Sequence, residues 1–113
     1  MTPDAFRSIA LSLPEAVEGG HMGHPDFRVG GRIFATLGSP DASCGVVKLS
    51  PDDQAVVVAA APAVFAPVAG AWGRAGHTQV RLAAADEAAV RSALRLAWRA
   101  RAPKRLLGRE GPS

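Results

Sequence analysis

The chain has 113 residues, of which 48% are hydrophobic, and its 13 basic and 10 acidic side chains give a formal net charge of +3. This length predicts one domain over residues 1–113, with residues 108–113 as a frayed tail. The hydrophobic content excludes a disordered chain, and the single cysteine excludes a disulfide framework or a cysteine-rich zinc module. No apolar stretch approaches the roughly 20 residues of a membrane span, and charged residues interrupt the N-terminal apolar segment, which is untypical of a signal peptide. We therefore expect a cytoplasmic protein with no membrane partner.

The first expected element is a helix that begins after Thr2 and ends before Pro14. Thr2 suits the N-cap position, and Pro3 fits the first helical position. Apolar residues then recur at helical spacing and predict one buried face: Phe6, Ile9, Ala10 and Leu13.

Residues 17–49 change to the alternation typical of β-strands. The pair Gly30-Gly31 permits positive φ at both central positions of a tight hairpin turn. Before this turn, Phe27 and Val29 face the same side of the predicted strand. After it, two alternations remain open: Ile33 with Ala35, or Phe34 with Thr36. Residues 44–49 (CGVVKL) predict another short strand.

Residues 50–61 are ambiguous between helix and strand. Ser50-Pro51 followed by two aspartates is a helix-start signal, whereas the three consecutive valines that follow favour a strand. We predict a helix that ends before Pro62. Beyond it, residues 64–72 predict a loop with a short edge strand, because proline and glycine interrupt them.

Residues 73–76 (GRAG) predict a turn, and residues 78–83 alternate cleanly. This alternation predicts a half-buried strand with Val80 and Leu82 facing inward. Residues 86–102 predict the last helix, which Pro103 ends. Its expected buried stripe is Val90, Leu94, Ala97 and Trp98.

The charge is unevenly distributed along the chain. Residues 1–90 carry six basic and nine acidic side chains, whereas residues 91–113 carry seven basic side chains and one acidic side chain. The net charges are therefore −3 and +6. A basic end of this kind indicates either an anionic partner or a solvated helix end, where the helix dipole favours cations.

Four segments in order are SLPEAVEGGHMGHPDFRVGGRIFATL, VKLSPDD, FAPVAGAWGRAGHTQVRL and ALRLAWRARAPKRL. Their order and spacing resemble the MmcQ/YjbR family of small bacterial proteins, from about Phe6 to Leu107. The resemblance implies an α+β fold in which an antiparallel sheet of about five strands packs against an N-terminal, a middle and a C-terminal helix. This CyaY-like arrangement is called a double wing. The resemblance also implies the family's usual description as DNA-binding proteins.

Several positions match the family's motifs: His24-Pro25, Phe27, Arg28, Lys48, Trp72-Gly73, Thr78 and Pro103-Lys104-Arg105. Two positions depart from the family pattern. Arg32 stands where a lysine is frequent, which keeps the charge. His77 stands where a tryptophan is common, which removes a large aromatic from the sheet region and weakens the case for stacking there.

No set of residues indicates an enzyme, because a nucleophile, a base and an orienting group cannot be assembled from the sequence. Cys44 is expected to be a small buried strand residue rather than a nucleophile. His21 and His24 lack a recognised spacing of zinc ligands. We therefore expect no catalysis, no metal and no cofactor.

DNA binding is the main hypothesis, since cations contact phosphates and aromatic side chains stack on bases. The candidate residues are Arg28, Arg32, Lys48, Trp72, Arg74, Lys104 and Arg105. Trp72 has two open interpretations, an exposed stacking residue or core packing over the sheet edge. The contacts are expected to be mainly electrostatic and poorly sequence-specific, made by a monomer or weak dimer.

The alternative function is a small-molecule or protein-interaction module. In that interpretation, a groove on the sheet binds a small anionic or aromatic ligand. The expected lining is Phe27, Phe34, Phe65 and Trp72, with Arg28 and Lys48 converging on it.

Overall fold

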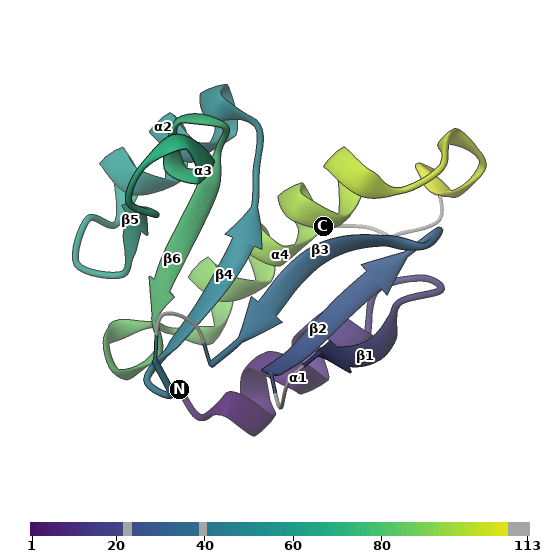
Figure 1. Cartoon of the computed structure of the whole chain (residues 1–113), viewed down its shortest axis with the longest axis horizontal. Helices are drawn as coiled ribbons and strands as arrows, with labels where there is room; N and C mark the ends of the chain where they lie inside the picture. The colour runs from purple at the N-terminus through teal and green to yellow at the C-terminus, as the bar shows by residue number, and fades with distance from the viewer. Residues whose placement is uncertain (22–23, 39–40, 109–113) are drawn as a thin grey trace.

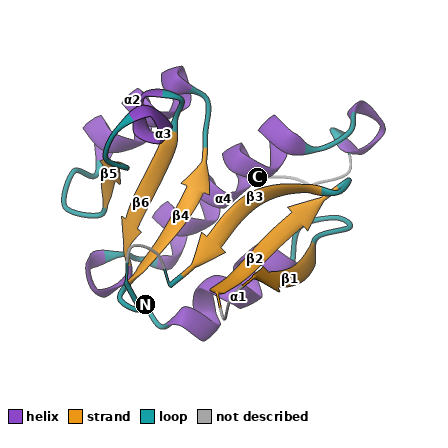
Figure 2. Ribbon diagram, in the orientation of Figure 1, coloured by secondary structure: helices purple, strands orange, loops and turns teal. Residues whose placement is uncertain are grey.

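The computed structural model describes residues 1–21, 24–38 and 41–108, and all but the first residue of the expected frayed tail lies outside that range. Figures 1 and 2 show a single sheet with helices arranged around it. The elements are α1 (Pro3–Leu11), β1 (Val17–His21), β2 (His24–Val29), β3 (Arg32–Leu37), β4 (Cys44–Lys48), α2 (Pro51–Ala60), β5 (Phe65–Pro67), α3 (Ala71–Arg74), β6 (His77–Arg81) and α4 (Glu87–Arg101). Two short 3₁₀ turns, η1 (Leu82–Ala84) and η2 (Lys104–Leu106), follow β6 and α4.

The strands form one sheet in the order β1-β2-β3-β4-β6-β5, and every neighbouring pair is antiparallel. This confirms the expected α+β fold with an antiparallel sheet. The described residues contain six strands rather than about five. The short strands β1 and β5 form the two edges, and β1 has the sequence VEGGH, whose glycines hide the usual alternation.

Helices α1 and α4 cover one face of the sheet, behind the strands in Figure 1. The predicted stripe of α4 is buried, and Trp98 at its centre has an exposed fraction of 0%. The Trp98 indole Nε1–H donates to the carbonyl of Pro14 at 3.0 Å, so the ring's polar group is satisfied inside the core. None of the described helices is long and apolar enough to cross a membrane.

The β2–β3 hairpin turns at Gly30 and Gly31, whose φ values of 58° and 78° confirm the predicted tight turn. A register shift between Phe27 and Arg28 interrupts the pairing with β3. At this irregularity both Phe34 and Ala35 are buried in the core. Neither simple alternation predicted for β3 is therefore complete, because the irregularity brings two consecutive residues inward.

The middle helix α2 is confirmed, and the Ser50 hydroxyl accepts from the Asp53 amide at 3.1 Å as its cap. Its three valines differ, since Val57 is buried whereas Val56 is 65% exposed. The capping signal at Ser50 and Pro51 therefore outweighs the β-propensity of the three valines.

The turn predicted at residues 73–76 is instead partly helical, because α3 spans Ala71–Arg74. A Cβ added at Gly73 would lie 1.7 Å from the carbonyl oxygen of Val68, so this short helix packs where only glycine fits. Strand β6 begins at His77, one residue earlier than predicted, and Val80 and Leu82 face inward as expected.

Candidate functional site

The face of the sheet opposite α1 and α4 carries a groove. Two adjoining hollows of about 230 and 360 Å³ share the side chains of Lys48, Trp72 and His77. We call this the open-face groove. Its lining residues are Arg28, Gly31, Arg32, Ile33, Thr36, Val46, Lys48, Val68, Trp72, His77 and Arg101.

Strand pairing brings two of these residues together. Lys48 at the end of β4 is the cross-strand partner of His77 at the start of β6. Because side chains alternate along a strand, both project to the open face while their neighbours Val47 and Thr78 are buried. The register of the β4–β6 pair therefore places a cation beside an imidazole.

Trp72 stacks on His77. The two ring centroids are 5.0 Å apart with an interplanar angle of 15°, and Trp72 is still 67% exposed. This resolves the open interpretation of Trp72 in favour of an exposed aromatic. It also corrects the expectation for His77, because the imidazole that replaces the common tryptophan itself takes part in a stacked pair.

Contacts to the backbone fix the segments that carry the stacked pair. Gln54 of α2 donates from Nε2 to the carbonyls of Gly73, at 2.9 Å, and His77, at 3.1 Å. Gly76 has a φ of 112°, and a Cβ there would lie 2.0 Å from the carbonyl oxygen of Leu49. Close backbone packing thus determines where α3 holds Trp72.

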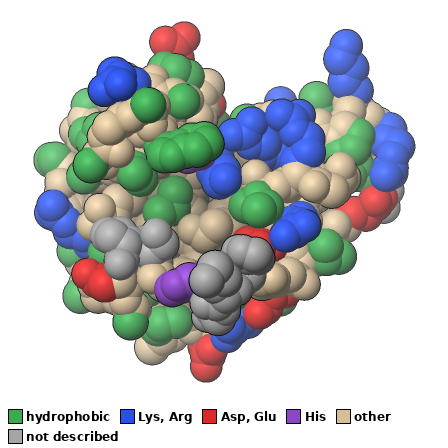
Figure 3. All heavy atoms as spheres, viewed as in Figure 1, with side chains coloured by type: hydrophobic (Ala, Val, Ile, Leu, Met, Phe, Trp, Pro, Cys, Tyr) green, Lys and Arg blue, Asp and Glu red, His purple; other side chains and the backbone are tan. Residues whose placement is uncertain are grey.

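The groove is lined by cations and, among the described residues, by no carboxylate. Figure 3 shows Lys and Arg side chains gathered over the upper part of this face. Arg32, Lys48 and Arg101 form no ion pair within the described part of the chain. Arg28 differs, because its Nε and Nη2 donate to the Asp26 carboxylate at 2.9 and 3.1 Å.

The titration behaviour reflects this positive environment. Burial and the nearby charge of Arg101 lower the pKa of Lys48 from its ordinary value. Burial, with Lys48 and Arg101, lowers the pKa of His77. The hydrogen bond from Arg28 lowers the pKa of Asp26. An anion in the groove would therefore relieve repulsion that the free protein carries.

Comparison with known proteins identifies the chain's relatives. A sequence model of the YjbR family matches residues 11–100. The chain belongs to the YjbR family. The crystal structure of Deinococcus radiodurans protein DR2400, a DUF419 domain, has the same fold, with a TM-score of 0.68 and 21% identity over 86% of this chain and 75% of that chain. No curated protein matches the sequence.

Of the sites predicted for this YjbR-family chain, four meet in the open-face groove: Arg28, Arg32, Lys48 and Trp72. Arg74 and Lys104 are exposed but do not line it. Arg105 donates to both carboxylate oxygens of Glu15, at 2.9 and 3.0 Å, so its charge already has a partner. Within the basic C-terminal end, Arg101 thus lines the groove whereas Arg105 is paired with Glu15.

Among the groove residues that were not predicted from the sequence, two carry ionisable side chains, Arg101 and His77. Arg101 follows Trp98 by three positions and Ala97 by four, so it continues the buried stripe of α4 toward the sheet. That spacing could have predicted from the sequence that Arg101 lies next to the sheet. His77 had no such signal, since its neighbour Lys48 is known only once β4 is paired with β6.

The aromatic lining expected for the alternative function is wrong in three positions. Phe27, Phe34 and Phe65 are buried in the core on the helix-covered side of the sheet. The irregularity in β3 and the β5–β6 pairing direct them there. Trp72, Arg28 and Lys48 do meet as expected.

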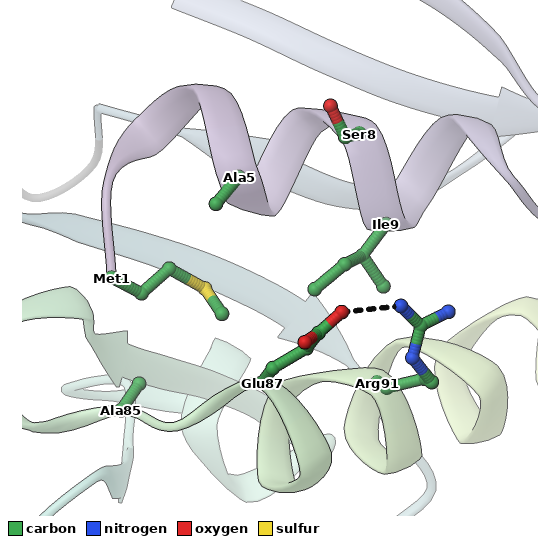
Figure 4. A pocket seen from close by; sticks show the side chains of 7 residues that line it. All are labelled: Met1, Ala5, Ser8, Ile9, Ala85, Glu87 and Arg91. Atoms are coloured by element: carbon green, nitrogen blue, oxygen red, sulfur yellow. Dashed lines mark hydrogen bonds and ion pairs between the residues drawn. The ribbon is translucent and has the colours of Figure 1, made fainter.

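A larger hollow of about 440 Å³ lies between α1 and α4 (Figure 4). Met1, Ala5 and Ile9 supply much of its apolar wall. Its two charged side chains pair with each other, because Arg91 donates to Glu87 at 2.7 Å. This hollow therefore lacks the group of cationic side chains without ion pairs that lines the open-face groove.

The described residues contain no cluster of three metal-ligating side chains. Cys44 is buried in β4, and its sulfur is 3.3 Å from Nε2 of Gln79. This agrees with a small packed strand residue.

Proposed function

We propose that this YjbR-family protein is a non-enzymatic DNA-binding protein that contacts phosphates through the open-face groove. The observation that carries the proposal is the convergence of Arg32, Lys48 and Arg101, which form no ion pair with a carboxylate in the described part of the chain. The Asp26 carboxylate acts on Lys48 only through its longer-range charge. Cations placed in this way release counterions when they neutralise phosphates, which favours binding.

The same geometry indicates low sequence specificity. Sequence is read mainly by hydrogen bonds to base edges, whereas phosphate contacts position the protein. The groove lining is mostly cationic or apolar, and among its residues Thr36 and His77 are uncharged side chains that can hydrogen-bond to base edges. The proposal is therefore mainly electrostatic binding, and it keeps the expectation of a cytoplasmic monomer or weak dimer.

A salt series tests the proposal. We expect the affinity for a random-sequence DNA to fall steeply with salt, and Lys48→Gln to reduce the slope of log affinity against log salt by about one. Arg91→Gln is the matched control, because Arg91 lies on the other side of the molecule and pairs with Glu87. Absence of binding at low salt, or equal slopes for Lys48→Gln and the parent, would contradict the proposal.

The stacked Trp72–His77 pair supports a second candidate function, binding of a small aromatic anion. Such a ligand would place its ring on Trp72 and its acid group near Lys48. A thermal-shift screen with aromatic acids should then raise the melting temperature of the parent but not of Trp72→Ala. An unchanged melting temperature throughout would count against this function.

A further inference from the structure

We infer that the open-face groove accepts an unpaired base, so that the protein prefers single-stranded DNA to duplex DNA. This inference rests on the proposed function and names the form of DNA that the groove fits. Its central observation is the exposed ring of Trp72, which His77 stacks against at an interplanar angle of 15°.

A stacking platform distinguishes the two forms of DNA. A base within a duplex has both of its faces covered by neighbouring bases, so it offers no face to Trp72 unless the duplex is disrupted. A base in a single strand can stack on an aromatic ring, and such stacking tolerates any sequence because every base has a π-face. The platform therefore adds affinity only for unpaired bases.

The cations lie where the adjoining phosphates would be held. Lys48 is the cross-strand partner of His77, and Lys48, Trp72 and Arg101 border the same hollow. The Arg101 Nε atom also lacks a hydrogen-bond partner within the described residues. An aromatic platform beside unpaired cations is the arrangement used to follow a single strand.

The open face does not offer the usual means of reading a duplex. At the tip of the β2–β3 hairpin, Pro103 packs against one side of the turn, since a Cβ at Gly30 would lie 2.9 Å from its ring, while Gly30 and Gly31 stay exposed. The long helix α4 packs on the opposite face and reaches the groove only with Arg101 at its C-terminal end, and α3 has only four residues. Neither α3 nor α4 is therefore placed to lie along a major groove from this face.

The test compares three probes with the same base: a short oligothymidylate, the same strand annealed to its complement, and thymidine monophosphate. Anisotropy of labelled strands gives the affinities, and quenching of tryptophan fluorescence reports contact with Trp72. The second tryptophan, Trp98, is 0% exposed and provides a constant background that also reports folding.

We expect the single strand to bind about tenfold or more tightly than the duplex and to quench Trp72. Trp72→Leu should abolish the preference, while Trp72→Phe should retain part of it because the aromatic face remains. Unchanged Trp98 emission verifies that the variants fold.

Three results would overturn the inference. Equal binding of strand and duplex, unaffected by Trp72→Leu, would leave the proposed function standing and remove the strand preference. Equal binding of the monophosphate and the strand would assign the groove to a free nucleotide instead. Absence of binding to any DNA at low salt would overturn the proposed function together with the inference.

Discussion

The two faces of the sheet are built from the same strands and differ completely in character. One face packs under α1 and α4, and the other carries the open-face groove. Neighbouring residues in the strands point to opposite sides: Phe27 and Arg28, Val47 and Lys48, Thr78 and His77. The alternation of a strand therefore places a core and a charged surface within one residue of each other.

The two tryptophans show the same contrast. Trp98 is fully buried and its indole nitrogen is hydrogen-bonded, whereas Trp72 is 67% exposed and stacked only on one side by His77. Large aromatic side chains usually lose most of their exposed surface on folding. Trp98 is therefore expected to contribute to stability, whereas Trp72 is the candidate for contact with a ligand.

The strongest test of this contrast replaces each tryptophan by alanine. Trp98→Ala should lower the free energy of unfolding by about 3–5 kcal/mol, because it leaves a cavity in the core. Trp72→Ala should lower it by less than about 1 kcal/mol, since the side chain is mostly exposed. Urea denaturation measures both, and similar losses would show that Trp72 belongs to the core.

A smaller loss of stability is expected from Gly73→Ala, which tests how α3 is positioned and with it Trp72. The new Cβ would clash with the carbonyl of Val68, so we expect a loss of about 1–3 kcal/mol and a displaced α3. Gly108→Ala is the control, because a Cβ there meets nothing within 4 Å. Denaturation together with Trp72 fluorescence separates lost stability from a shifted helix.

Arg28→Met tests the ion pair between Arg28 and Asp26 on strand β2. Asp26 is 4% exposed, and Arg28 holds its pKa below 3.8, so the pair contributes stability above that pH and the contribution is lost as the pH falls below it. The variant should be less stable than the parent at neutral pH, because the buried Asp26 carboxylate loses its charged donor, and its acid unfolding midpoint should move to higher pH.

The control for that experiment is Arg91→Met, which breaks an exposed pair with Glu87. Exposed helix pairs contribute only about 0.3–0.5 kcal/mol. If both variants shift the acid midpoint equally, the Asp26 carboxylate does not depend on Arg28.

The smallest predicted effect concerns His77 and reports the charge of the groove. Burial, Lys48 and Arg101 lower the pKa of His77 below 6.5, so the folded state binds fewer protons than the unfolded state and stability rises as the pH increases toward 6.5. Lys48→Gln should raise this pKa, because it removes a nearby positive charge, and flatten that rise. NMR titration of the imidazole measures it; an unchanged pKa would show that the two groups do not interact.

The linear pattern of residues was sufficient for most local structure. Proline and capping residues predicted where α1 and α2 begin, the glycine pair predicted the β2–β3 turn, and the spacing of apolar residues predicted the buried stripe of α4. These features depend on interactions within a few residues of each other, so the sequence contains the information directly.

The candidate site was only partly predictable. Arg28, Arg32, Lys48 and Trp72 were named from the sequence, but Phe27, Phe34 and Phe65 were assigned to the wrong side of the sheet. Which side of a strand becomes the core depends on where the helices pack and on irregularities such as the one in β3. Neither can be deduced from alternation alone.

The sequence by itself determined the kinds of side chain available and the local elements that carry them. The tertiary structure alone decided which cations stay unpaired. Pairing of β4 with β6 placed Lys48 beside His77, and the packing of α4 brought Arg101 to the same groove, while Arg105 met Glu15 instead. These partners are distant along the chain, and only the packing of sheet and helices sets the distances on which their electrostatic interactions depend.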